Sequence, residues 1–161
     1  MKRLVLVFAF FTLLGLAKTS TNFVIAVVSG EAITHRYMEI ESVLETPSVF
    51  KEGYSLNLEN TSSQRLLQQL VIRSMVMDEN RVLKIYQVPK VDVDQKYAQF
   101  QKAIGGSRLK EFIQHYSLSE ADIRNRLESW IVLEKTLSDQ EDVETWLKRL
   151  RARHEVTLFK R

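Results

Sequence analysis

The sequence predicts a mainly α-helical domain that is closed by a small pairing of two β-strands, one from each end of the domain. Between residues 34 and 153, apolar side chains recur mostly at spacings of three and four residues, which is the period of amphipathic helices. Short β-branched apolar runs flank this region at residues 23–28 and 155–159, and their composition favours strands. The predicted fold class is therefore multi-helical, with a two-stranded β pairing of the N- and C-terminal segments.

The first seventeen residues have the order of a secretory signal peptide. Lys2 and Arg3 precede an apolar run over residues 4–16, and Gly15 and Ala17 supply the small side chains that precede a cleavage site. The run is shorter than the roughly 20 apolar residues that cross a bilayer. We expect cleavage after Ala17 and a periplasmic location; the alternative is an uncleaved membrane anchor.

Residues 18–161 then form a single domain. Without Lys2 and Arg3, 21 basic residues remain against 20 acidic ones, so no strong positive field is left to attract nucleic acid. The chain contains no cysteine, which excludes disulfides, thiolate metal sites and cysteine nucleophiles. The stability of the domain is therefore expected to come from packing.

The N-terminal part of this domain predicts a strand followed by a helix. The apolar run at residues 23–28 ends at Gly30, and Thr34 is a suitable N-cap for the helix. Pro47 ends that helix, because the residue before a proline disfavours helical geometry. Residues 46–61 have no regular apolar period, so they are predicted to form a loop that packs mainly on the core.

Two helices are predicted in the middle of the chain. Residues 63–86 are apolar on nearly all sides of a helix, which indicates a buried central element. The next helix is predicted to begin with Asp92 as its N-cap and Gln95 at the capping-box position. Gly105 and Gly106 are expected to end it, because a helix commonly ends at a residue in the left-handed conformation.

The C-terminal part predicts two more helices and the closing strand. Ser119 is a suitable N-cap, with Asp122 three residues later, for a helix that runs to Leu137. A polar break at residues 138–142 precedes a last amphipathic helix, and the β-prone residues 155–159 follow it.

The common patterns of catalytic and metal-binding sites are missing from the sequence. His35, His115 and His154 lack the spacing of metal ligands and are expected at helix surfaces or ends. Asp92 and Asp94 are not followed by the glycine and glutamate of a calcium loop. No serine lies in a nucleophile elbow and no glycine loop has the register of a phosphate-binding loop. We therefore expect no enzyme activity, no cofactor and no metal.

Four segments resemble the SurA-like periplasmic chaperone family, in the same order along the chain. Residues 27–34, VVSGEAIT, resemble the family's VVNGEPIT opening, and residues 66–79 resemble its long central helix. Residues 112–137 are similar to the GLSxxxLRxxLRxxLLxxKL region, and residues 146–156 to the last helix and closing strand. The resemblance spans nearly the whole of residues 18–161 and implies the fold of the SurA chaperone core.

Two departures from the family pattern limit what the resemblance implies. Ser29 stands where the family commonly has asparagine before Gly30. More importantly, family members commonly carry a parvulin-type prolyl isomerase domain between the last two helical regions, and only residues 138–142 fill that place here. The resemblance therefore implies the chaperone core without the isomerase domain.

The implied function is that of a holdase, a chaperone that binds unfolded secreted or outer-membrane polypeptides without catalysis. Within the 46–61 loop, the candidate client-binding residues are Val49, Phe50, Tyr54 and Leu56. Expected partners are unfolded or extended polypeptides; nucleic acid is not expected, nor is membrane contact after the signal is cleaved. The alternatives are a dedicated interaction module of a cell-envelope assembly and an isomerase-related protein.

Overall fold

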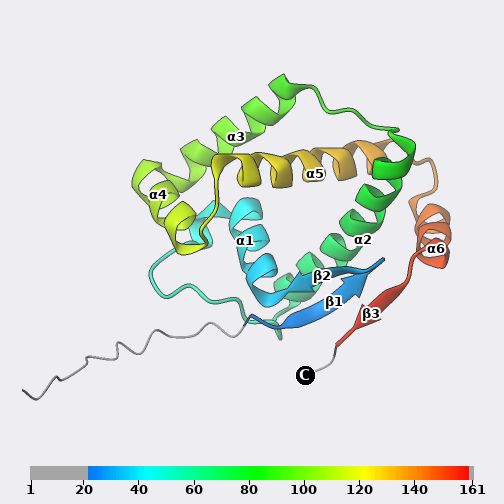
Figure 1. Ribbon diagram of the computed structural model, residues 1–161, viewed down its shortest axis with the longest axis horizontal. Helices are drawn as coiled ribbons and strands as arrows, with labels where there is room; N and C mark the ends of the chain where they lie inside the picture. Colours follow the sequence, from blue (N-terminus) through cyan, green and yellow to red (C-terminus); the bar gives the residue numbers. More distant parts are fainter. Residues whose placement is uncertain (1–21, 160–161) are drawn as a thin grey trace, which may run out of the picture.

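The computed structural model describes residues 22–159, and the predicted signal peptide, residues 1–17, lies outside them. Within the described residues the fold is mainly helical, with six α-helices and one small antiparallel sheet. Figure 1 shows the sheet at one side of the helical body, with the first and last described segments both in it. The predicted fold class is confirmed.

The sheet has three strands in the order β2-β1-β3. β1 (Val24–Val28) pairs with β2 (Glu31–Thr34) in a hairpin and with β3 (Val156–Leu158) on its other side, both antiparallel. The pairing of the two terminal segments is thus confirmed, but the expectation of only two strands is wrong. Ser29 and Gly30 both have positive φ, 47° and 85°, as in the tight two-residue hairpin turns whose twist matches that of the strands. The hairpin leaves four residues for the extra strand, β2, before the first helix begins.

The first helix, α1 (His35–Glu45), begins as predicted at Thr34, whose hydroxyl accepts a hydrogen bond from the backbone N–H of Tyr37. After a short 3₁₀ turn at Pro47–Val49 and an irregular loop, α2 (Thr61–Leu83) begins at Asn60, whose side chain caps the backbone N–H of Ser63 at 2.7 Å. α2 lies against α1, α5, α6 and the hairpin. Its predicted role as the central element is confirmed.

The predicted N-cap of the next helix, Asp92, is wrong by three residues, because the observed N-cap is Pro89. α3 (Lys90–Ile104) follows Pro89, whose carbonyl accepts from the N–H of Asp92 at 3.0 Å. Asp92 therefore lies in the first turn, where its negative charge faces the positive end of the helix dipole, and its carboxylate is 3.1 Å from the ammonium of Lys135. Gly105, at φ 84°, ends the helix as predicted, and α4 (Gly106–His115) follows directly.

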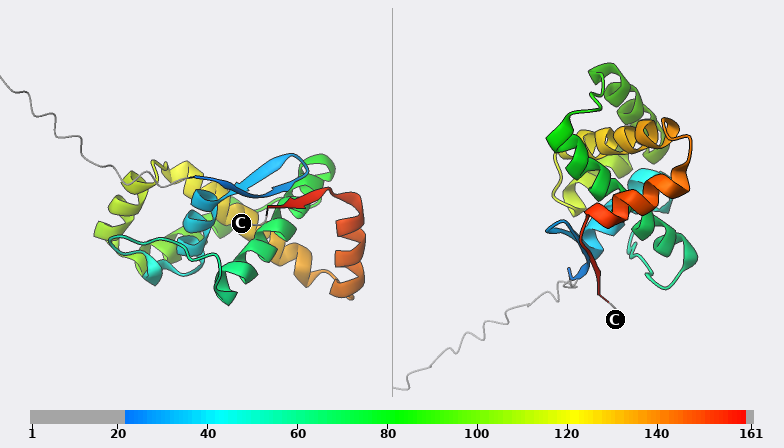
Figure 2. Two further views of the ribbon diagram at one scale, coloured as in Figure 1. Left: turned by 90° about the horizontal axis from the view of Figure 1, so that it is seen from below. Right: turned by 90° about the vertical axis from the view of Figure 1, so that its right-hand side faces the viewer.

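α5 begins at the predicted cap, and α6 begins directly after the predicted polar break. α5 (Glu120–Ser138) starts with a complete capping box between Ser119 and Asp122. α6 (Val143–Arg153) is capped by Asp142, whose carboxylate accepts from the N–H of Thr145 at 3.0 Å. α6 leads directly into β3, which returns the chain to the N-terminal hairpin (Figure 2).

The interior consists of two apolar clusters that share α1 and α5. One lies between the sheet, α2 and α6 and includes Val28, Leu70 and Leu150; the other lies between α1, α3, α4 and the first half of α5 and includes Phe100, Phe112 and Ile123. Phe112 is packed edge-to-face against three aromatic rings of its cluster.

A buried carboxylate joins three helices where the two clusters meet. Glu41 of α1 is fully buried and accepts from Arg73 of α2 and Arg126 of α5, each at 2.7 Å, and from the indole N–H of Trp130 at 2.8 Å. Arg73 is also buried, and it donates to the hydroxyl of Tyr37 at 2.7 Å and lies over the Trp130 ring. Both Glu41 oxygens and both charged partners are thus satisfied inside the fold, which is the condition for an ion pair to be tolerated there.

The electrostatics of Glu41 follow from this arrangement. Burial by itself raises the pKa of the carboxyl group, but the guanidinium groups of Arg73 and Arg126 outweigh burial and hold the pKa below its usual value of 4.5. Because the pKa is lower in the folded than in the unfolded chain, ionisation of Glu41 favours folding above the unfolded pKa, and this contribution is lost as pH falls through the folded pKa.

None of the helices in the described part of the chain is both long and apolar enough to span a membrane.

Replacing Glu41 by glutamine is expected to lower the free energy of unfolding by about 3–5 kcal/mol, because it leaves the buried guanidinium of Arg73 and the partly buried one of Arg126 without their carboxylate partner. Urea unfolding followed by circular dichroism measures this change. The matched control is Glu144→Gln, which removes an exposed i,i+4 partner of Lys148 and is expected to cost less than about 1 kcal/mol. Equal effects of the two substitutions contradict a central role for Glu41.

The free energy of unfolding is expected to fall below its value at neutral pH when the protein is acidified. The loss starts near the usual carboxyl pKa of 4.5 and continues as the pH falls. The same titration on Glu41→Gln isolates the contribution of this group. The difference in unfolding free energy between the two proteins should shrink as pH falls, and a difference that stays constant from neutral pH downward contradicts the assignment.

Candidate functional site

An apolar groove lies between the sheet, α1 and the start of α2, and we call it the terminal groove because the first and last described segments both line it. Its volume is about 580 Å³. Seven apolar residues line it, and five polar ones complete it: Phe23, Ile25, Met38, Leu56, Leu58, Leu67 and Phe159, with His35, Asn57, Glu59, Ser63 and Gln64.

The strand register places the aromatic side chains of the groove. The backbone N–H of Phe159 donates to the carbonyl of Ile25 at 2.9 Å, so these two residues are directly opposite across β1 and β3. Residues opposite each other in an antiparallel pair point to the same face of the sheet. Phe159 and Ile25 therefore form one wall of the terminal groove, and α2 and the loop before it form the other.

The loop wall is fixed through the backbone of Leu56. Its carbonyl accepts from Nε2 of His35 at 3.1 Å, and its N–H donates to the carboxylate of Glu39 at 3.3 Å. Since the carbonyl can only accept, the proton of His35 is on Nε2, and the ring also stacks on Phe23 with centroids 5.1 Å apart. These contacts hold the groove open between α1 and the loop.

The groove is open to solvent at its aromatic end. The side chain of Phe159 is 51% exposed, and its neighbour Leu158 is 60% exposed. The hydroxyl of Ser63 is buried in the lining without a hydrogen-bond partner among the described residues. The site therefore presents exposed apolar surface at its aromatic end.

The four predicted client-binding residues do not form one surface. Leu56 lines the terminal groove, but Phe50 is only 6% exposed and packs against Phe112 and Tyr116. Val49 and Tyr54 are half-buried against the same cluster, and the Tyr54 hydroxyl is hydrogen-bonded to Ser42. The expectation that Phe50 offers apolar surface is wrong, because its ring completes the interior; the expectation that the loop packs mainly on the core agrees with these contacts.

Phe50 and Tyr54 also border a second hollow, of about 740 Å³, between the loop and α4. Its other lining residues are polar or glycine: Lys51, Glu52, Gly53, Glu111, Gln114 and His115.

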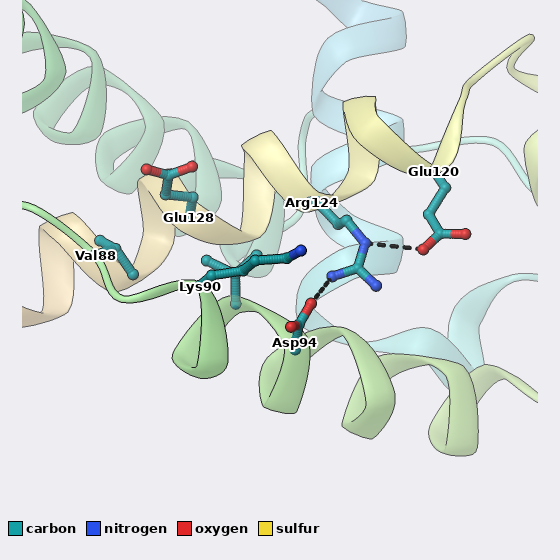
Figure 3. Close-up of a pocket in the computed structure, with 7 residues that line it drawn as sticks. Val88, Lys90, Asp94, Glu120, Arg124 and Glu128 are labelled. Atoms are coloured by element: carbon teal, nitrogen blue, oxygen red, sulfur yellow. Dashed lines mark hydrogen bonds and ion pairs between the residues drawn. The ribbon is translucent and has the colours of Figure 1, made fainter.

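A third pocket, of about 540 Å³, lies between α3 and α5 and is mainly charged (Figure 3). In it Arg124 donates to Glu120 at 2.8 Å and to Asp94, and its guanidinium also lies 4.3 Å from the centre of the Tyr97 ring. Arg124 therefore already binds two carboxylates and an aromatic face. Its contacts with Asp94 and Tyr97 connect α5 to α3.

The histidines lie at helix ends, as predicted. His35 is the first residue of α1, His115 the last of α4, and His154 follows the last residue of α6. In the part of the chain that the structure describes, no group of three or more acidic or histidine side chains is placed to hold a metal ion.

Sequence reasoning missed most of the terminal groove. Leu58 follows Leu56 at the strand-like spacing of two, and Phe159 follows the predicted closing strand, so both carried a local signal. Nothing local indicates that Phe23 and Phe159 line the same groove, because their placement depends on strand register.

No protein-family model matches this chain, and no curated protein matches it significantly in sequence. The resemblance to SurA-like chaperones therefore stays a prediction from the motifs.

Replacing Phe159 by alanine is expected to weaken the binding of a naphthalene-sulfonate dye roughly fivefold to tenfold, because a Phe side chain provides one wall of the groove. Dye fluorescence during titration measures the dissociation constant. Ile85→Ala removes a comparably exposed apolar side chain outside the groove and is the matched control. If both variants lose the dye equally, the dye does not report the groove.

Proposed function

We propose that this protein is a periplasmic holdase-type chaperone that binds unfolded secreted or outer-membrane polypeptides in the terminal groove and catalyses no reaction. The observation that carries the proposal is an open apolar groove with an exposed aromatic wall at Phe159. Exposed contiguous apolar surface on a soluble domain marks a binding site. The signal-peptide pattern of residues 1–17 and the resemblance to SurA-like chaperones support the same function.

The lining of the groove suits a client of varied sequence. Apolar and aromatic walls bind any aliphatic or aromatic side chain with a free energy that is roughly proportional to the apolar area buried. The exposed polar rim of Asn57, Glu59 and Gln64 can bond to peptide groups, which every client has. Such a site distinguishes unfolded from folded chains, because only unfolded chains expose apolar side chains and unpaired peptide groups together.

A second candidate, a dedicated interaction module of a cell-envelope assembly, is favoured by a separate apolar patch. Val82, Leu83, Ile85 and Val91 are each more than half exposed where α2 ends and the chain passes to α3. A patch on a connecting segment fits a single folded partner. One stable stoichiometric complex would support this function, and a broad range of unfolded clients supports the holdase.

Residues 18–161 are expected to suppress aggregation of an outer-membrane β-barrel protein diluted from urea, at close to equimolar ratio, with light scattering as the measurement. Phe159→Ala should need roughly fivefold more protein for the same suppression, since it removes most of one groove wall, whereas Ile85→Ala should act like the parent. No suppression at several-fold excess of folded protein contradicts the holdase function.

The isomerase alternative has a separate test. A proline-containing tetrapeptide assay measures cis–trans isomerisation directly, and acceleration above the uncatalysed rate would contradict the absence of catalysis. This assay leaves the aggregation result unaffected, so the two functions are decided independently.

A further inference from the structure

Within residues 22–159, the outer edge of β3 presents backbone groups that have no hydrogen-bond partner. The N–H of Ser29 donates to the carbonyl of Glu155, and the N–H of Phe159 donates to that of Ile25, both at 2.9 Å. With Val27 opposite Thr157, residues 155, 157 and 159 direct their backbone groups toward β1. In an antiparallel ladder the intervening residues direct theirs to the other side, so the N–H and C=O groups of Val156 and Leu158 point away from β1.

These outward groups are accessible. Neither residue has a hydrogen bond at this edge within residues 22–159, Val156 is half-buried, and Leu158 is exposed. In Figures 1 and 2 no described helix or strand lies beyond β3 on that side of the sheet. The edge also lacks the proline, lysine or bulge with which proteins commonly protect an open strand, since residues 155–159 read Glu-Val-Thr-Leu-Phe.

We propose that an extended segment of an unfolded polypeptide adds to the sheet as a fourth strand against β3. The inference rests on the holdase function and specifies how its clients are held. Two N–H donors and two C=O acceptors, on residues two positions apart, match only a backbone in the extended conformation. A helix satisfies its own backbone groups and does not fit this edge.

The side chains beside the edge define the chemistry of the segment. Leu158 and Phe159 point to opposite faces of the strand, and both are at least half exposed. On one face an incoming strand meets Leu158, and on the other it meets Phe159 at the mouth of the terminal groove. The segment that fits therefore carries apolar or aromatic residues on both faces near this end, and its backbone supplies affinity that does not depend on sequence.

The other sheet edge fits such a segment less well. In β2, residues 31 and 33 pair with Val28 and Ala26 of β1, which leaves Ala32 as the residue whose backbone faces outward before Thr34 caps α1. The β3 edge is therefore the one we assign to the client.

Hydrogen exchange of single backbone amides tests the inference. ¹⁵N-labelled residues 18–161, which contain every described residue, are measured by NMR with and without a nine-residue peptide of alternating tyrosine and valine. Saturating peptide is expected to slow exchange at Val156 and Leu158 at least about tenfold, since each N–H gains a partner. Thr157, already paired with Val27, should change less. Peptide binding with unchanged exchange at Val156 and Leu158 overturns the inference.

A pair of substitutions at one residue separates the backbone from the side chain. Leu158→Ala and Leu158→Pro both remove the leucine side chain, but only proline removes the outward N–H, and proline is tolerated at a strand edge in that orientation. The peptide dissociation constant should be roughly fivefold to tenfold higher for the proline than for the alanine variant. Equal constants in two folded variants overturn the inference.

A change in the peptide keeps the inference testable if the proline variant does not fold. N-methylation of alternate peptide residues leaves the side chains in place and removes donors from one edge of the peptide strand. One of the two alternating sets is expected to abolish binding and the other to preserve it. Equal binding of both sets overturns strand addition while leaving the holdase function standing, whereas failure of the parent protein to bind unfolded chains overturns both.

Discussion

The pairing of β1 with β3 is the interaction on which the terminal groove and the open strand edge depend. It joins segments about 130 residues apart, since Ala26 lies opposite Leu158 and Val28 opposite Val156. Closing so long a loop costs conformational entropy before any contact compensates for it. The pairing has a single register, which brings Phe159 beside Ile25 and thereby forms one wall of the terminal groove. The same register directs the outer backbone groups of Val156 and Leu158 toward solvent.

The helical body supplies the rigidity that this small sheet needs. Three strands of three to five residues are stable only when a face is packed, and α2 and α6 provide that packing. The buried Glu41, Arg73 and Arg126 cluster then fixes α1 relative to α2 and α5. A satisfied ion cluster adds little net stability over an apolar core of the same shape, but it penalises any rearrangement that separates its members. The groove walls on α1 and α2 are therefore held at a fixed spacing.

A holdase must bind many sequences weakly enough to release them. A groove lined by apolar side chains gives binding that scales with buried area, and a short open strand edge adds contacts that any extended backbone can make. Both sit at the same end of the molecule and share Phe159. The charged pocket around Arg124 has its guanidinium occupied within the fold, so it serves the architecture.

The sequence by itself determined the helical class, the strand at each end, and helix starts such as Thr34 and Ser119, because apolar period and capping chemistry act over a few neighbouring residues. It placed the N-cap of α3 three residues late, because Asp92 is a good cap by residue type while the carbonyl of Pro89 already accepts from the first turn. Only the tertiary structure decided which apolar residues are surface. Phe50 is turned into the aromatic interior and Phe159 is left at the groove mouth, and these outcomes depend on helix packing and strand register between distant segments, which no local pattern encodes.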